Sequence, residues 1–416
     1  MRHQINSDDL RAPEMAEAIE KCVHCGFCLA ACPTYKLLGE EMDSPRGRIY
    51  LMKGVLEEKI TADDAQPFID RCLGCMACVP ACPSGVAYGD LLVSYRTLQE
   101  GSRLRSLSDG AARRLIIETL PYPRRFRLAM KSGKIGRTLQ PFLPEAFAAM
   151  LNMLPDKLPP PSPLPPILPA QGDRRGVVAL LSGCVQQALA PQINMAAAKV
   201  LSANGVEVHI PAGQSCCGSI LLHIGAEAEA RQIARRNFPL MPDDIDAIIT
   251  TAAGCGSGMK DYELLFKGQT DLQKASDFSG KVMDFSAYLA QLGLREPRGF
   301  ATERAVAYQD ACHLLHAQGL QSEPRDLLNQ VPNLRLVDIL DAGMCCGSAG
   351  TYNLDQPAIA EELGRQKADA ILAAGPDTIV SGNIGCIRQL RKHLDLQGEN
   401  LPVMHIAELL WAAYQS

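Results

Sequence analysis

Apolar runs and polar turns alternate regularly in the second half of the chain. "VVALLSGC" at 177–184 is an apolar run that ends at a cysteine, and the helix-like segment after it has proline near its start and glycine after its end. The short runs "VEVHI" (206–210) and "AIIT" (247–250) predict further buried strands, with a helical stretch between them from about Ile220 to Phe238. This order of elements predicts an α/β module with parallel strands.

The same order recurs from residue 305. "AVAYQDAC", "LRLVDI" and "TIVSG" predict the strands of the second copy, and a helix is expected near 356–374. Three cysteine pairs correspond at offsets of 128 to 131 residues: Cys184 and Cys312, Cys217 and Cys346, Cys255 and Cys386. We therefore predict a duplicated module whose cysteines gather at the carboxyl ends of the strands, where open parallel sheets bind ligands.

The first half of the chain is patterned as helices. Apolar residues Ile49, Met52, Val55 and Leu56 follow helical spacing within a long helix-forming stretch. The segment "PDKLPPPSPLPPILPA" at 155–170 contains eight prolines, which fix φ and remove hydrogen-bond donors. It predicts an extended connector between the two halves.

Composition and charge narrow the class of protein. A chain of 416 residues leaves room for two or three domains, and a net charge of -5 argues against general nucleic-acid binding. The first twenty residues contain no apolar core of a secretory signal, and no run of 18 uncharged apolar residues occurs, so we expect neither export nor a membrane span. Sixteen cysteines in a reducing compartment then favour metal ligation over disulfides.

Half of the cysteines form two copies of one motif, "CVHCGFCLAACP" from Cys22 and "CLGCMACVPACP" from Cys72. The spacing C-x2-C-x2-C-x3-C-P is typical of two-cluster ferredoxins, in which the last cysteine of each run serves the other cluster. It assigns Cys22, Cys25, Cys28 and Cys82 to one 4Fe-4S cluster, and Cys32, Cys72, Cys75 and Cys78 to the second. Structural zinc sites usually have two close pairs separated by a spacer, so the spacing favours iron and sulfur. Gly26 and Gly74 leave room for a cluster and for approaching backbone N–H groups.

The other eight cysteines give each module four thiols. The candidate metal ligands are Cys184, Cys216, Cys217 and Cys255 in the first module, and Cys312, Cys345, Cys346 and Cys386 in the second. Four thiols suit a cubane, an unusual cluster or zinc, and the pattern leaves these alternatives open. The modules end in "CGSG" and "CIRQ" instead of C-x-x-C, which argues against a five-cysteine centre. His223, His313 and His316 are candidate replacement ligands, although a lone histidine more often serves as a hydrogen-bonding or surface residue.

Basic residues raise two further alternatives. Residues 102–153 carry ten Lys or Arg against three acids, and we favour a solvated helical face there over contact with an anionic membrane. Arg46 and Arg48 either lower the cost of the clusters' negative charge or form surface ion pairs.

The chain resembles the iron-sulfur subunits of glycolate oxidase over nearly its full length. The stretches that carry the resemblance are these motifs together with "GCVQQALAPQINMAAAKVL", "CCGSAGTYN" and "NIGC". The resemblance implies an oxidoreductase complex in which FAD-binding subunits oxidise glycolate, or D-lactate in related members, while this subunit passes electrons to a quinone or another respiratory-chain acceptor. It also implies a cytoplasmic location, peripheral to the inner membrane. Similar cluster runs occur in lactate-utilisation, anaerobic glycerol-3-phosphate dehydrogenase and heterodisulfide reductase complexes, so an electron-transfer or thiol-disulfide subunit of such a complex is the alternative.

The fold class that we predict is α+β with several domains. We expect a helical ferredoxin-type domain over 1–100, a basic helical segment and proline-rich linker over 101–173, and cysteine-rich modules over 174–300 and 301–416. No acid-base pair for removing a substrate proton stands out, so we expect the chain to carry electrons without binding glycolate.

Overall fold

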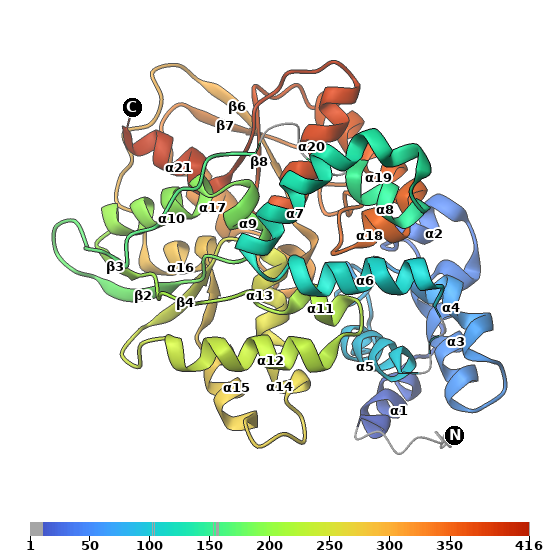
Figure 1. Cartoon of the computed structure of the whole chain (residues 1–416). Coiled ribbons are helices and arrows are strands. Elements are labelled where there is room, and N and C mark those ends of the chain that lie inside the picture. The colour runs from blue at the N-terminus through green and yellow to red at the C-terminus, as the bar shows by residue number, and fades with distance from the viewer. Residues whose placement is uncertain (1–10, 102, 104, 153, 155–157, 416) are drawn as a thin grey trace.

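The computed structural model describes residues 11–101, 103, 105–152, 154 and 158–415, which form a helical N-terminal part and two α/β modules (Figure 1). The sheet of the first module has the strand order β1-β3-β2-β4-β5, and that of the second module has the order β7-β6-β8-β9. The strands are β1 Ile167–Leu168, β2 Gly176–Leu180, β3 Val206–His209, β4 Ala247–Thr250, β5 Val282–Asp284, β6 Arg304–Gln309, β7 Leu334–Val337, β8 Thr378–Ser381 and β9 Val403–His405.

Apart from β1, the two sheets are built alike. All their pairings are parallel except that of β1 with β3, and β3-β2-β4-β5 corresponds in order to β7-β6-β8-β9. This confirms the predicted fold class and the duplicated parallel arrangement. The proline-rich connector ends by adding β1 to the edge of the first sheet, which its composition did not predict.

The helices of the modules follow the expected pattern with one exception. They are α9 Val185–Leu189, α10 Gln192–Ala203, α11 Ser219–His223, α12 Glu227–Asn237, α13 Ala253–Lys260, α14 Tyr262–Leu265, α15 Leu272–Gly280, α16 Phe285–Leu292, α17 Glu323–Asn329, α18 Tyr352–Asp355, α19 Pro357–Ala373, α20 Ile384–Leu396 and α21 Ile406–Gln415. Short helical turns are η3 Phe238–Leu240 and the π-helical η4 His313–Ala317. The helical stretch predicted from about Ile220 to Phe238 is present as two helices, because Gly225 adopts φ 75° between α11 and α12.

The N-terminal part is helical, as predicted. Its helices are α1 Ala12–Glu20, α2 Pro33–Leu38, η1 Glu41–Asp43, α3 Pro45–Leu56, α4 Ala62–Asp70 and α5 Tyr88–Glu100, followed by α6 Leu107–Thr119, α7 Pro123–Gly136, η2 Arg137–Phe142 and α8 Glu145–Asn152. Each cysteine run leaves a helix, α1 or α4, and forms a turn beyond it. Pro33 then starts α2, where the missing N–H costs no helical hydrogen bond. Met15, Met52, Ile69 and Leu91 fill the core between these helices.

The two modules share one apolar core. It contains Val178 and Leu180 from β2 together with Val306 from β6 and Val380 from β8. Helix α10 of the first module packs on α21 of the second, and α16 of the first packs on α17 of the second. In Figure 1 the blue N-terminal helices lie beside α18 and α19 of the second module. Within the described part of the chain, no helix has the length and apolar character needed to cross a membrane.

Candidate metal centres

Four thiols from both cysteine runs lie around one surface hollow. Cys22, Cys25 and Cys28 of the first run and Cys82 of the second line it together, and Cys78 lies at its inner side. Burial raises the pKa of Cys22, and the nearby Cys82 and Cys25 thiols raise it further. We call Cys22, Cys25, Cys28 and Cys82 the first thiol set. The structure therefore brings Cys82 to the run that the spacing assigned to it.

The remaining four thiols, Cys32, Cys72, Cys75 and Cys78, form the second thiol set and are all buried. Burial raises the pKa of Cys78 well above its ordinary value, and the thiols of Cys72 and Cys32 add to the shift. Cys32 thus lies with the second run although it belongs to the first. The thiols of each set would repel one another if all were ionised without a metal.

Left-handed backbone shapes both cysteine turns. His24 and Gly26 have φ 54° and 88°, and the corresponding Gly74 and Met76 have φ 62° and 61°. Such residues bend the backbone tightly around Cys25 and Cys75, which lie between them, and backbone N–H groups in tight turns stabilise negative charge. The Gly74 N–H donates to Cys72 Sγ at 3.4 Å. The turns are therefore suited to an anionic cluster, as the glycines at 26 and 74 predict.

A buried arginine lies beneath the second thiol set. The Arg48 guanidinium donates to Thr34 Oγ1 at 2.9 Å, forms an ion pair with Asp43 at 3.2 Å, and approaches Cys32 Sγ at 3.8 Å. Burial opposes ionisation of Cys72, but Arg48 and Arg96 outweigh it and hold the pKa of this thiol below its ordinary value. Arg48 therefore offsets negative charge at the second set.

Arg46 forms the surface pair that was one of its two predicted roles, and it also lines the hollow of the first thiol set. Its guanidinium binds Glu41 Oε1 at 2.6 Å and donates to the His24 carbonyl at 2.9 Å. A Cβ at Gly26 would lie 2.8 Å from Arg46 Nη1, so glycine is needed for this close approach.

Each module also gathers its four cysteines. Cys184 Sγ lies 3.3 Å from Cys216 Sγ, and hydrogen bonds from Cys216 and Cys255 lower the pKa of the Cys217 thiol well below its ordinary value. In the second module, Cys345 and Cys386 act in the same way on Cys346, and Cys312 contacts Cys345. The predicted convergence at the strand ends is thus present in the structure, without assigning these thiols a metal.

Two of the three candidate histidines, His223 and His313, line one cavity together with Cys184, Cys216, Cys217, Cys255 and Cys312. His313 Nδ1 is 2.5 Å from Ser257 Oγ, and His316 Nε2 is 2.9 Å from the Gly343 carbonyl. The rings of His223 and His313 lie 5.6 Å apart, and burial lowers the pKa of His223 to about 3. Among the described residues, no group of three or more His, Cys, Asp or Glu side chains is arranged to hold a single metal ion.

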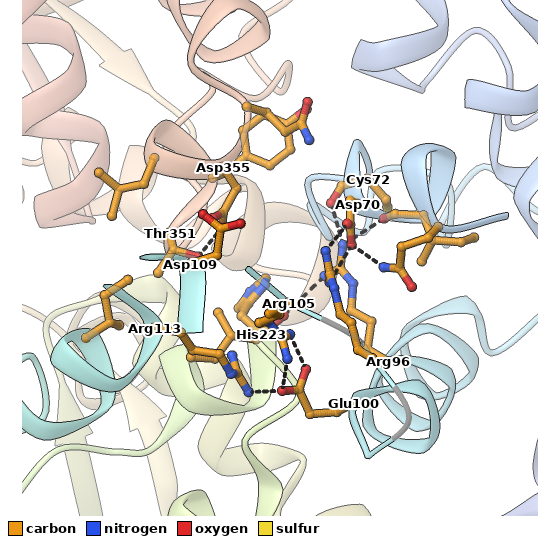
Figure 2. A pocket seen from close by; sticks show the side chains of 18 of the residues that line it. Asp70, Cys72, Arg96, Glu100, Arg105, Asp109, Arg113, His223, Thr351 and Asp355 are labelled. Carbon is orange, nitrogen blue, oxygen red and sulfur yellow. Dashed lines mark hydrogen bonds and ion pairs between the residues drawn. The ribbon is translucent and has the colours of Figure 1, made fainter. Parts of the chain in front are cut away.

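A cavity of about 500 Å³ opens beside the second thiol set, between α4, α5, α6 and α18 (Figure 2). Arginine and acid pairs line one side, with Arg103 bound to Asp70 at 2.6 Å and Arg113 bound to Glu100 at 2.7 Å. The Cys72 carbonyl accepts a hydrogen bond from Arg96 at 2.7 Å. The cavity combines residues from three distant parts of the chain, so no local motif could have predicted it.

Two residues that line this cavity carry buried polar groups. The Tyr95 hydroxyl has no hydrogen-bond partner although the residue is buried and lines the cavity. Burial raises the pKa of Asp355, whose carboxyl group accepts a hydrogen bond from Thr351 at 2.6 Å. An acceptor atom in the cavity would satisfy the Tyr95 hydroxyl.

Comparison with known proteins matches both kinds of cysteine motif. Residues 18–86 match the 4Fe-4S dicluster domain family, and residues 178–260 and 306–391 match the cysteine-rich domain family. The chain is 37% identical to the glycolate oxidase iron-sulfur subunit of Escherichia coli over 97% of this chain and 96% of the relative. The chain belongs to the family of glycolate oxidase iron-sulfur subunits. Family membership and the dicluster domain confirm the two predicted 4Fe-4S clusters and the electron-transfer role.

Other relatives broaden this family. A probable glycolate oxidase iron-sulfur subunit of Bacillus subtilis is 34% identical over 94% of this chain and 93% of its own length. Lactate utilization protein A of an Exiguobacterium species is 27% identical over 56% of this chain and 96% of its own length. These matches agree with the general role of an iron-sulfur subunit in an oxidoreductase complex.

The crossed arrangement of the thiols gives a specific test. Replacing Cys82 with serine should disturb the cluster near Cys25 and largely preserve the cluster near Cys75, because only the first set loses a thiolate. Electron paramagnetic resonance of the reduced protein, prepared without oxygen, separates the two signals. Cys32→Ser is the matched control and should have the opposite effect. Loss confined to the second cluster in the Cys82 variant would contradict the assignment.

Proposed function

We propose that this chain is the electron-transfer subunit of a glycolate dehydrogenase complex. In this proposal, FAD-binding partner subunits oxidise glycolate, or D-lactate, and this chain takes the electrons one at a time. The observation that carries the proposal is the arrangement of the two thiol sets, in which each cysteine turn contributes its last cysteine to the other set. One set lies near the surface and the other is buried. The names of the full-length relatives supply the substrate.

The proposal assigns the ligands as the spacing does. Cys22, Cys25, Cys28 and Cys82 would hold one cluster, and Cys32, Cys72, Cys75 and Cys78 the other. Bound clusters supply one-electron redox chemistry. The chain itself supplies the Arg48 charge, the Gly74 N–H group and the burial that set the polarity around the second set. The four thiols of each module are proposed as a further metal site.

Purification without oxygen tests the function as a whole. We expect the chain to copurify with flavin-containing subunits, and glycolate to reduce its iron-sulfur signals, since the clusters accept what the flavin releases. Counts of iron, acid-labile sulfide, zinc and flavin identify the centres, including those of the two modules. A preparation that lacked iron and sulfide yet supported full turnover of its complex would refute the proposal.

We further propose that a quinone accepts the electrons at the cavity in Figure 2. The cavity adjoins Cys72 of the second thiol set, and its volume of about 500 Å³ suits a drug-sized organic molecule. Apolar residues such as Ile69 and Ile116 line it beside the polar groups. The unpartnered Tyr95 hydroxyl is a donor suited to a quinone carbonyl.

Removing that hydroxyl should weaken quinone binding. With Tyr95→Phe we expect a short-chain quinone analogue to bind about two- to tenfold more weakly, which corresponds to one hydrogen bond. Direct binding measurements on the cluster-loaded protein provide the readout. Tyr122→Phe, outside the cavity, should leave binding unchanged. Equal affinity of the Tyr95 variant and the wild type would place the acceptor elsewhere.

We also propose a peripheral location at the cytoplasmic face of the inner membrane. Leu107, Leu128 and Phe142 are exposed on the helices of the basic segment, where Arg124 and Lys131 are exposed as well. Exposed apolar and basic side chains together suit the surface of an anionic bilayer.

Vesicle binding distinguishes this location from a solvated helical face. The chain should sediment with vesicles containing anionic lipid, less so at high salt because salt screens the attraction. Vesicles of neutral phosphatidylcholine serve as the control, and Phe142→Asp should reduce binding further. Absence of sedimentation with anionic vesicles would support the solvated face.

A further inference from the structure

The second cysteine turn, residues 72–78, is covered by the second module. Leu73 is 3% exposed and Ala77 is 7% exposed, and both belong to an apolar cluster with Cys312 and Tyr352. The Tyr352 hydroxyl donates to the Arg71 carbonyl at 2.8 Å, which fixes the module against the turn. The covered residues alternate with the cysteines of the motif.

This cover brings a thiol of the module to the turn. Cys75 and Cys312 are both buried in the same apolar cluster. The apolar residues of the second turn therefore form an interface that places a thiol of the module beside a cluster ligand.

The first cysteine turn, residues 22–28, has the same motif, but no other segment of the described chain covers it in this way. Val23 and Phe27 correspond to Leu73 and Ala77 at the offset of 50 residues, yet they are 67% and 68% exposed. Cys25 between them is exposed as well. Tyr50 of α3 adds an exposed apolar side chain beside the turn, with its ring centroid 6.4 Å from that of His24.

We define Val23, Cys25, Phe27 and Tyr50 as the first-turn face. Large exposed apolar side chains gathered at one place mark interaction sites more often than scattered ones do. Two charged pairs at its edge are already satisfied within the chain, Arg46 with Glu41 at 2.6 Å and Lys21 with Glu17 at 2.8 Å. An apolar centre with a polar edge is the usual composition of a protein interface.

We propose that the first-turn face docks the flavin-bearing partner subunit that delivers electrons to this chain. The inference rests on the proposed function and adds the surface through which this chain receives its electrons. The second turn shows how the motif is used when it is covered, since apolar contact there places the Cys312 thiol beside the turn. Electron tunnelling falls steeply with distance, so a donor must approach the cluster at its exposed ligand, Cys25. Because the charges at the edge are paired, the partner's matching face is apolar.

The test uses the cluster-loaded chain and its copurified flavin subunits. Phe27→Asp should weaken their association by about tenfold or more, as for an interface hot spot, in a binding measurement such as calorimetry. Leu396→Asp is the matched control, since Leu396 is equally exposed on α20, outside the first-turn face. Because the apolar contact dominates, raising the salt concentration should change the wild-type affinity by less than threefold.

A second variant distinguishes loss of docking from loss of the cluster beside Phe27. Tyr50→Asp lies outside the cysteine run and should also weaken association, with both iron-sulfur signals and the thermal unfolding temperature unchanged. If the wild type binds the flavin subunits and both variants bind like Leu396→Asp, the docking inference is wrong while the proposed function stands. If the variants instead convert a dimer of this chain to a monomer, the face serves a second copy. If the wild type does not bind flavin subunits at all, both proposals fail.

Discussion

The mutual repulsion of crowded thiols is the constraint on which the N-terminal part depends. Eight cysteines are gathered into two small regions, and burial and neighbouring thiols raise the pKa of Cys22, Cys28 and Cys78. Neutral thiols can lie this close together, but thiolates repel one another, and iron removes the conflict by binding the thiolates directly. Backbone N–H groups in the left-handed turns and the buried Arg48 contribute further positive charge. Cluster binding and folding of this part are therefore coupled.

Much of this arrangement could be predicted from local spacing. The C-x2-C-x2-C-x3-C-P runs predicted the exchange of Cys32 and Cys82, and the structure places each of them with the other run. The apolar runs that end at cysteines predicted four thiols at the carboxyl edge of each sheet. These features succeed because the information for them lies within a few residues of sequence, or repeats at a fixed offset.

Features made by distant segments were not predictable in this way. The cavity of Figure 2 joins Asp70, Arg113 and Thr351, which no sequence pattern relates. β5 and β9 have three residues each, too few to show an apolar period. Arg46 and Arg48 are two positions apart in α3, yet Arg46 lies at the surface and Arg48 is buried. The two residues lie on different faces of the helix, one toward solvent and the other toward the core. The sequence left these two roles open, and only the packing of α3 distinguishes them.

The pairing of helices between the modules has a consequence for how the duplication is maintained. Helices α10 and α17 are equivalent, since they follow the equivalent strands β2 and β6. Helices α16 and α21 are equivalent in the same way, since they follow β5 and β9. The contact of α10 with α21 is therefore the same as the contact of α17 with α16, made a second time. Such reciprocal contacts define an isologous interface, the kind found in twofold symmetric homodimers. The chain therefore contains, within one polypeptide, the geometry of a dimer of single modules. Covalent linkage frees the two halves to diverge, so that the second module places Cys312 beside Cys75 while the first places His223 against Gly74 of the same turn.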